Sequence, residues 1–149
     1  MIKVEDMMTR HPHTLLRSHT VMDAKNMMNE FDIRHIPIVD TDNKLLGIVT
    51  QRDILAAQDS CLQNAATSSS FNLSAPLNDV MHKNIMTVAP IAGLKESAIY
   101  MQKHKVGCLP VVDKQQLTGI ITDSDFVTIA INLLELEEES EPNELDMID

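Results

Sequence analysis

Cysteine and glycine are both scarce in this chain: the 149 residues include only Cys61, Cys108 and four glycines. Two cysteines are too few for the disulfide framework of a small secreted protein, so we expect a reduced, cytoplasmic setting. With so little glycine there is no Gly-x-x-x-x-Gly-Lys phosphate loop, and neither Gly-x-Ser-x-Gly nor His-Glu-x-x-His occurs. The sequence therefore contains no recognisable catalytic motif, and we do not expect an enzyme.

Long apolar runs are also missing. No stretch approaches the roughly 20 apolar residues that a membrane-spanning helix needs. The N-terminal residues 1–6 have no apolar segment and no small-residue cleavage site, so a secretory signal is not expected. We therefore expect no association with a membrane.

Basic residues form no cluster, although the formal net charge is −10. Eight acidic residues and no Lys or Arg lie within 135–149, which leaves 14 acidic and 12 basic residues in the rest of the chain. Without a basic patch to neutralise a phosphate backbone, nucleic-acid binding is not expected. The acidic run either continues a helix and then frays in solvent, or binds a partner. His11-Pro12-His13 lacks nearby carboxylates, so no metal site is predicted.

Two segments of the chain repeat each other at a nearly constant offset. Pro-Ile-Val-Asp at 37–40 and Gly-Ile-Val-Thr at 47–50 return as Pro-Val-Val-Asp at 110–113 and Gly-Ile-Ile-Thr at 119–122. The offset is 73 residues up to Asp113 and 72 residues after it, so one residue is missing from the turn between the motifs. This register indicates a duplicated unit.

Each unit has the same predicted order, strand–helix–strand–strand–helix. In the first unit we expect these elements at 13–16, from Thr20, at 36–39, at 45–49 and after Thr50. In the second unit we expect them at 86–89, around Leu94, at 109–112, at 117–121, and after Thr122 to about Glu138. Packed face to face across a pseudo-twofold axis, the two β-α-β-β-α units would form one α/β (α+β) module.

The predicted organisation is a first repeat at 1–56, a linker at 57–76, a second repeat at 77–134 and an acidic tail at 135–149. The linker includes Thr67-Ser68-Ser69-Ser70 and is typical of a helix that gives way to a flexible loop. We do not interpret it as a boundary between independently stable domains. The tail is predicted to be a helix end followed by a disordered segment.

On these motifs the sequence resembles the CBS (cystathionine β-synthase) domain family, and specifically a stand-alone pair of CBS domains. The resemblance covers residues 4–55 and 77–127, nearly all of the chain outside the linker and tail. Each motif alone is only moderately specific. Both motifs in both copies, at the same spacing, are a strong signal.

The resemblance implies a regulatory module that binds an adenine nucleotide (AMP, ADP or ATP), or S-adenosylmethionine, in clefts between the repeats. It also implies a disc-like homodimer and an unknown regulated protein, with no required cofactor. In the family pattern the Thr and Asp of Gly-x-x-Thr-x-x-Asp contact phosphate or ribose, while an early Thr and the residues before the proline line the cleft. The ligand-binding residues expected here are Thr14, Arg34, His35, Ile36, Pro37, Thr50, Arg52, Asp53, Thr87, Leu109, Pro110, Thr122, Ser124 and Asp125.

The Thr-x-x-Asp motifs have two interpretations. A Thr three residues before an acidic residue at the start of a helix forms a capping box, which satisfies free backbone N–H groups. The same helix end favours a ligand phosphate, and a carboxylate can accept hydrogen bonds from two ribose hydroxyls. Thr and Asp in both copies favour ligand binding. Arg52 contacts a phosphate or lies on a solvated face, and the same alternatives hold for Arg34 and His35.

Two hypotheses of different classes remain: an adenine-nucleotide sensor, and a ligand-free dimerisation or protein-interaction module. If nucleotides bind, the two clefts are predicted to be unequal. Residues 51–53 carry a formal charge of 0 and residues 123–125 carry −2, so the first cleft should bind phosphate more tightly.

Overall fold

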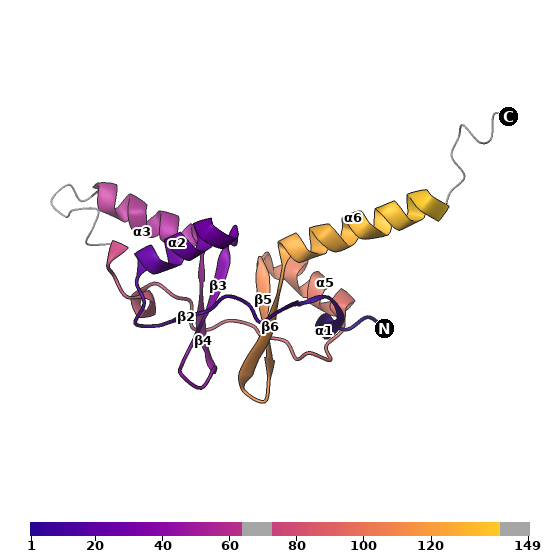
Figure 1. Cartoon of the computed structure of the whole chain (residues 1–149), viewed down its shortest axis with the longest axis horizontal. Coiled ribbons are helices and arrows are strands. Elements are labelled where there is room, and N and C mark those ends of the chain that lie inside the picture. Colours follow the sequence, from indigo (N-terminus) through magenta and orange to yellow (C-terminus); the bar gives the residue numbers. More distant parts are fainter. Residues whose placement is uncertain (64–72, 141–149) are drawn as a thin grey trace.

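The computed structural model describes residues 1–63 and 73–140, and its elements fall into two halves that lie side by side (Figure 1). Each half contains a three-stranded sheet, with the order β2-β3-β4 in the first half and β1-β6-β5 in the second. The predicted α+β fold class is confirmed. Within the described ranges, no helix has both the length and the apolar composition that crossing a membrane requires.

The first half follows the predicted order of elements, which are β2 (Leu15–Leu16), α2 (Val21–Phe31), β3 (His35–Val39), β4 (Leu45–Thr50) and α3 (Gln51–Gln63). A capping box starts α2: the Thr20 hydroxyl accepts a hydrogen bond from the Asp23 N–H, and the Asp23 carboxylate accepts one from the Thr20 N–H. β3 pairs antiparallel with β4 and parallel with β2. The helix start predicted near Thr20 is therefore correct.

The second half contains η1 (Leu77–Asp79), α5 (Leu94–His104), β5 (Cys108–Asp113), β6 (Gln116–Thr122) and α6 (Asp123–Ser140). The strand predicted at 86–89 is reduced to one parallel bridge between Val88 and Val111. Pro90 lies two residues further on and has no backbone N–H, so the ladder does not continue. The predicted loop at 67–70 and the predicted disordered segment within 141–149 lie outside the described residues.

The repeats exchange the segments that precede their first strands. α1 (Val4–Met7) and β1 (Thr9–Arg10) belong to the second half, where β1 pairs antiparallel with β6. In return, Leu77 packs in the core of the first half, and its N–H donates a hydrogen bond to the His19 carbonyl at 2.8 Å. Each half is thus completed by chain from the other repeat, which makes the pair one structural unit.

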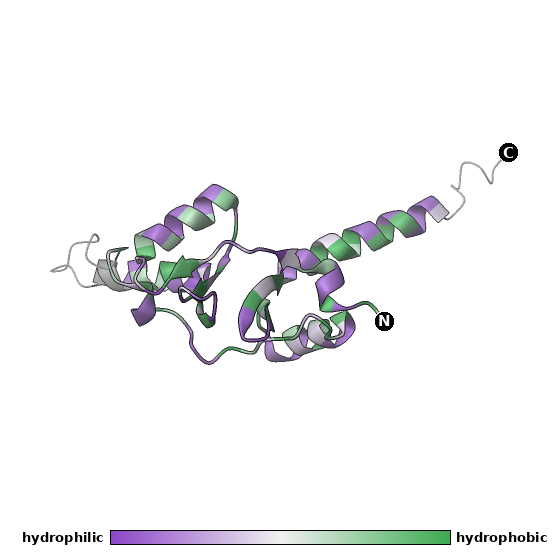
Figure 2. Ribbon diagram, turned by 60° about the horizontal axis from the view of Figure 1, so that its bottom comes forward, coloured by the Kyte–Doolittle hydropathy of each residue, from purple (hydrophilic) through white to green (hydrophobic). Residues whose placement is uncertain are grey.

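Each half has its own apolar core. The first core combines one face of α2 with the inward residues of the sheet, and its buried members are Leu15, Val21, Ala24, Met28, Ile36, Ile38, Val49, Ile54 and Leu77. The second core is built the same way around α5, from Val4, Leu94, Met101, Leu109, Val111 and Ile121. Figure 2 shows apolar residues along the strands and helices of both halves.

The two hairpin turns join the halves at one end. The Asn43 side-chain amide donates a hydrogen bond to the Leu117 carbonyl at 2.8 Å, and the Leu117 N–H donates to the Asn43 carbonyl at 3.1 Å. Asn43 has φ 62°, a left-handed conformation that asparagine tolerates well in turns. Away from these turns, the space between the halves opens into a cleft.

Candidate ligand-binding cleft between the repeats

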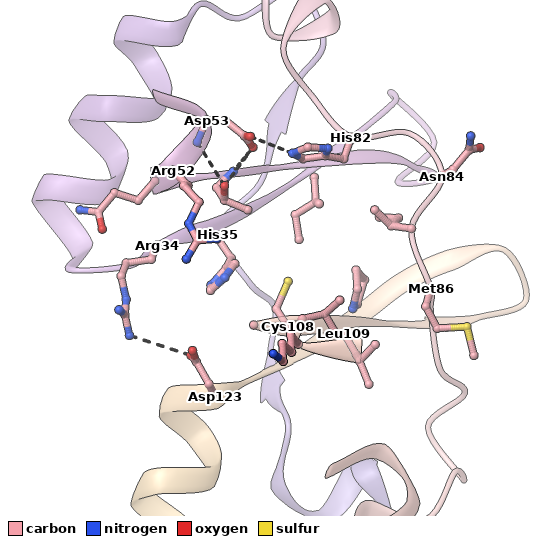
Figure 3. Close-up of a pocket in the computed structure, with 18 of the residues that line it drawn as sticks. Arg34, His35, Arg52, Asp53, His82, Asn84, Met86, Cys108, Leu109 and Asp123 are labelled. Carbon is pink, nitrogen blue, oxygen red and sulfur yellow. Dashed lines mark hydrogen bonds and ion pairs between the residues drawn. The ribbon is translucent and has the colours of Figure 1, made fainter. Parts of the chain in front are cut away.

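A cleft of about 920 Å³ lies between the two halves (Figure 3). Its walls come from the start of β3, the β4–α3 junction, the segment 82–86, and residues 105–110 before and within β5. Both repeats therefore contribute. The predicted site residues that line it are Arg34, His35, Thr50, Arg52, Asp53, Leu109 and Pro110.

Thr50 and Asp53 form a capping box at the first turn of α3. The Asp53 Oδ2 atom accepts hydrogen bonds from the Thr50 N–H at 2.8 Å and from the Thr50 hydroxyl at 3.0 Å. The Asp53 N–H donates back to the Thr50 hydroxyl oxygen at 3.3 Å. The capping interpretation therefore holds, and it fixes the Asp53 carboxylate on the cleft wall, where a ligand can also reach it.

His82 is a site residue that the sequence analysis missed. Its Nε2 atom lies 2.7 Å from Asp53 Oδ1, and because an ionised carboxylate only accepts, this ring nitrogen carries the proton. The exchange of segments brings His82 here, and its N–H and carbonyl both pair with the backbone of Ile48. The repeat offset makes Thr9 the equivalent of His82. Thr9 makes the corresponding contact in the other half, where its hydroxyl donates a hydrogen bond to Asp125 Oδ1 at 3.3 Å.

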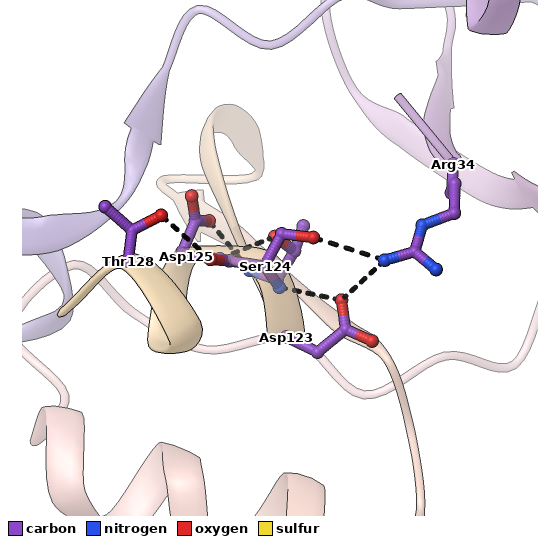
Figure 4. Close-up of polar contacts among 6 residues, drawn as sticks. Arg34, Asp123, Ser124, Asp125 and Thr128 are labelled. Carbon is purple, nitrogen blue, oxygen red and sulfur yellow. Dashed lines mark hydrogen bonds and ion pairs between the residues drawn. The ribbon is translucent and has the colours of Figure 1, made fainter. Parts of the chain in front are cut away.

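The cleft carries more positive than negative charge. Its lining includes the cations Arg34, Arg52 and Lys105 and the carboxylates Asp53 and Asp123. Arg34 is the only one of these cations with an ion pair in the described chain: its Nη2 lies 3.9 Å from Asp123 Oδ1 and donates a hydrogen bond to Ser124 at 3.3 Å (Figure 4). Arg52 and Lys105 remain available for an anionic ligand.

Asp123 changes the comparison of the two clefts. The sequence analysis assigned its charge to the second cleft, but Asp123 also borders the first. Its carboxylate holds Arg34, which stands between the two hollows and lines both of them. The charges of residues 51–53 and 123–125 therefore cannot be assigned to two independent sites, because Arg34 and Asp123 border both hollows.

Two neutral groups lie deep in the cleft. Burial lowers the pKa of His35 below its usual 6.5, an effect that Asp123 opposes and Arg34 reinforces. Burial, together with the negative charge of Asp123, raises the pKa of the Cys108 thiol to about 12. At neutral pH His35 is therefore uncharged and Cys108 is protonated. His35 can donate a hydrogen bond to a phosphate there, but it adds no charge.

Several predicted residues do not line this cleft. Ile36 and Pro37 are fully buried, and Ile36 packs in the first core rather than facing the opening. Thr122 and Asp125 form a second capping box at the start of α6, with the Thr122 N–H donating to Asp125 Oδ2 at 2.8 Å. Ser124 borders a smaller hollow of about 440 Å³, with Arg34, Asp123, Val127 and Thr128. Thr14 and Thr87 border neither hollow.

The fold is a tandem pair of α+β repeats with a cleft between them, and comparison with known proteins agrees. The CBS domain model matches residues 4–60 and 77–132. The chain belongs to the CBS domain family, and it contains two copies of the domain.

Solved structures show the same arrangement. A Vibrio cholerae protein named for acetoin utilization, AcuB, is 70% identical, with 95% of this chain and 99% of that one aligned and a TM-score of 0.81. CBSX2 in complex with AMP is 28% identical over 89% of this chain and 98% of that one, with a TM-score of 0.75. The CBS domain pair of MJ0100, solved with 5′-methylthioadenosine and S-adenosylmethionine, is 26% identical over 89% and 98%, with a TM-score of 0.73.

Relatives with curated functions include much longer enzymes. Homoserine O-acetyltransferase of Methanococcus vannielii is 31% identical over 87% of this chain and 25% of the enzyme. Inosine-5′-monophosphate dehydrogenase of Halalkalibacterium halodurans is 36% identical over 78% of this chain and 22% of the enzyme. The chain thus spans about a quarter of the length of these relatives.

Proposed function

We propose that this protein is a regulatory module that binds an adenine nucleotide, AMP, ADP or ATP, in the cleft of about 920 Å³ between its repeats. The observation that carries the proposal is the composition of this cleft. It combines a fixed carboxylate at the start of a helix, two cations without an ion pair in the described chain, and an apolar wall. The AMP and S-adenosylmethionine complexes of related CBS pairs support a ligand of this class.

Each part of a nucleotide has a matching part of the cleft. Asp53 is placed to accept a hydrogen bond from a ribose hydroxyl. Its Oδ2 atom already accepts two hydrogen bonds from Thr50, but its Oδ1 atom is paired only with His82 and keeps one lone pair free. Arg52, at the first turn of α3, offers its guanidinium to the phosphate beside the positive end of the helix dipole. Val106, Leu109 and Pro110 give the adenine ring an apolar wall.

Regulation follows from the position of the ligand between the repeats. A phosphate near Arg34 competes with Asp123 for the guanidinium, and Asp123 is the first residue of α6. The ligand therefore changes a contact between the repeats, and through it the surface offered to a regulated protein. Catalysis is not part of the proposal, because the enzyme relatives match this chain over only about a quarter of their length.

The proposal includes a homodimer. Exposed apolar side chains lie on every long helix of the two halves: Met22 and Phe31 on α2, Leu55 on α3, Ile99 on α5 and Val127 on α6. Such surfaces are typical of interfaces rather than of solvated monomers. If the module is instead a ligand-free interaction domain, these surfaces remain and the cleft stays without a nucleotide.

The AcuB relative suggests where the module acts. Identity of 70% over nearly the whole length of both chains supports a shared role, so we propose that this protein acts in acetoin utilization. Introducing its gene into a Vibrio cholerae strain that lacks AcuB tests this, with growth on acetoin compared with growth on glucose. If AcuB is needed for growth on acetoin, restoration of that growth alone is expected, and failure to restore it would contradict the assignment.

A thermal-shift screen tests nucleotide binding. AMP, ADP, ATP and S-adenosylmethionine are added separately to the full chain, and a ligand at 100 times its Kd should stabilise the fold by about 2.7 kcal/mol. Asp53→Asn should abolish the shift. Asp125→Asn removes the equivalent carboxylate of the other capping box and should preserve it, so this pair separates ligand binding from capping.

A further inference from the structure

The second half of α6 leaves the body of the protein. Phe126 and Ile129 pack against the second core, but every residue from Ala130 to Ser140 is exposed. Figure 1 shows α6 projecting beyond the sheet and helix that it starts from. We call residues 130–140 the acidic extension.

The acidic extension exposes large apolar side chains. Leu133, Leu134 and Leu136 are about three-fifths exposed, with values of 60%, 59% and 61%. Figure 2 shows apolar and polar residues mixed along this part of α6. An isolated helix end is marginal in water, and most helices in proteins depend on packing for their stability. Three neighbouring leucines that the described part of the chain leaves mostly exposed therefore indicate a surface that another molecule covers.

The same segment carries an unusual charge. Glu135, Glu137, Glu138 and Glu139 are all exposed, and α6 contains no basic residue in its last turn. Negative charge at the C-terminal end of a helix is unfavourable, because the helix dipole is negative there. These carboxylates form no ion pair with the described part of the chain. Glu137 lies one turn after Leu133 and Glu138 one turn after Leu134, so charge and apolar surface share a face.

The charge of the extension is found in one repeat only. Leu55 on α3 is equivalent to Val127 on α6, and both are exposed, as expected for an interface that obeys the pseudo-twofold symmetry. Positions 63–67, which are equivalent to 135–139, contain no charged residue. The negative charge of the acidic extension therefore has no counterpart at the equivalent positions of the first repeat.

We propose that the acidic extension docks a basic amphipathic helix of a partner protein. Leucines on that helix would cover Leu133, Leu134 and Leu136, and its Lys or Arg residues would pair with the flanking glutamates. A second copy of this chain fits less well, because it would bring the same four glutamates into a surface that is already negative. Since α6 begins at Asp123 on the cleft, the docked partner would be attached to the helix that senses the ligand.

A pair of synthetic helices tests the charge and the apolar part separately. One peptide has a leucine face flanked by lysines, and the matched control has glutamates in place of the lysines. Fluorescence anisotropy with the full chain should show binding of the lysine peptide that weakens with salt, and no binding of the control. Glu137→Lys combined with Glu138→Lys should reverse this preference by roughly tenfold or more.

Leucine variants complete the test. Leu133→Gln combined with Leu136→Gln should weaken binding of the lysine peptide about tenfold or more, while Leu55→Gln on α3 should leave it unchanged. Circular dichroism confirms that each variant keeps its helices. Three results would overturn the proposal: no binding of the lysine peptide, binding that ignores the leucine variants, or leucine variants that change only the mass of the protein's own oligomer.

Discussion

Both carboxylate oxygens of Asp53 have partners before any ligand arrives, and Oδ1 keeps one lone pair. Its Oδ2 atom accepts two hydrogen bonds from Thr50, and its Oδ1 atom lies 2.7 Å from the ring of His82. The first contacts belong to the cap of α3, but the contact with His82 comes from the other repeat. Because His82 orients the carboxylate without capping the helix, its contribution to a ligand site can be measured apart from the contribution to folding.

His82→Ala should weaken nucleotide binding about three- to tenfold, which corresponds to the roughly 1 kcal/mol of one hydrogen bond. Its effect on the melting temperature should be small, since the His82 side chain is more than half exposed. Thr9→Val removes the equivalent contact at Asp125 and serves as the control. Equal affinity for the wild-type protein and the His82 variant would show that the ring does not position Asp53 for a ligand.

The buried ring of His35 predicts a pH dependence of stability. Its pKa is lowered in the folded protein, mainly by burial, while the unfolded chain has the usual value of 6.5. Between the two values the unfolded state binds more protons, so stability is fully present above pH 6.5 and falls as the pH drops through that value. His35→Gln should reduce the loss of melting temperature between pH 7 and pH 5. An unchanged slope would mean that His35 is not desolvated.

At the scale of elements, the sequence predicts well the helix starts that depend on contacts between residues close in the chain. Thr20 with Asp23, and Thr50 with Asp53, start helices where the capping pattern places them. The exchange of segments escaped prediction because Val4 and Leu77 are equivalent in the repeat alignment. Each is an apolar residue that must be buried, and nothing in the local pattern says which of two similar cores will bury it.

The exposed end of α6 predicts that truncation is tolerated. Residues 131–140 bury no side chain, so deletion of residues 139–149 should change the free energy of unfolding by no more than about 0.5 kcal/mol, as for other surface changes. Chemical denaturation of the full and truncated chains measures this. A loss of several kcal/mol would show that the acidic tail packs on the rest of the protein.

At the scale of the whole molecule, the duplicated sequence does not produce two equal sites. Leu109 and its equivalent, Ile36, are each buried in the core of their own half, but only Leu109 also borders the main cleft. Arg34 has Gly107 as its counterpart, and a Cβ atom at Gly107 would lie only 2.9 Å from His35 Nε2. Sequence motifs could place the Thr-x-x-Asp caps in both repeats. Only the packing of the repeats shows that one of the two caps borders the large cleft.

The exposed helix faces predict a dimer in solution. Light scattering at micromolar concentration should give the mass of two chains. Leu55→Glu combined with Val127→Glu should convert the protein to a monomer, because each places a charge on an apolar face. The Leu133→Gln and Leu136→Gln variant, outside that face, should remain dimeric. A wild-type protein that runs as a clean monomer would contradict the dimer.

The central claim, one adenine-nucleotide site between the repeats, is tested most directly by titration calorimetry with AMP and ADP. We predict one dominant site per chain. Arg52→Ala should weaken it about five- to tenfold, since a charge ~7 Å from a phosphate at an effective dielectric of ~40 contributes about 1 kcal/mol. Asp53→Asn should abolish it, and Asp125→Asn should leave it intact. No heat with either nucleotide, or equal losses in the Asp53 and Asp125 variants, would contradict this account.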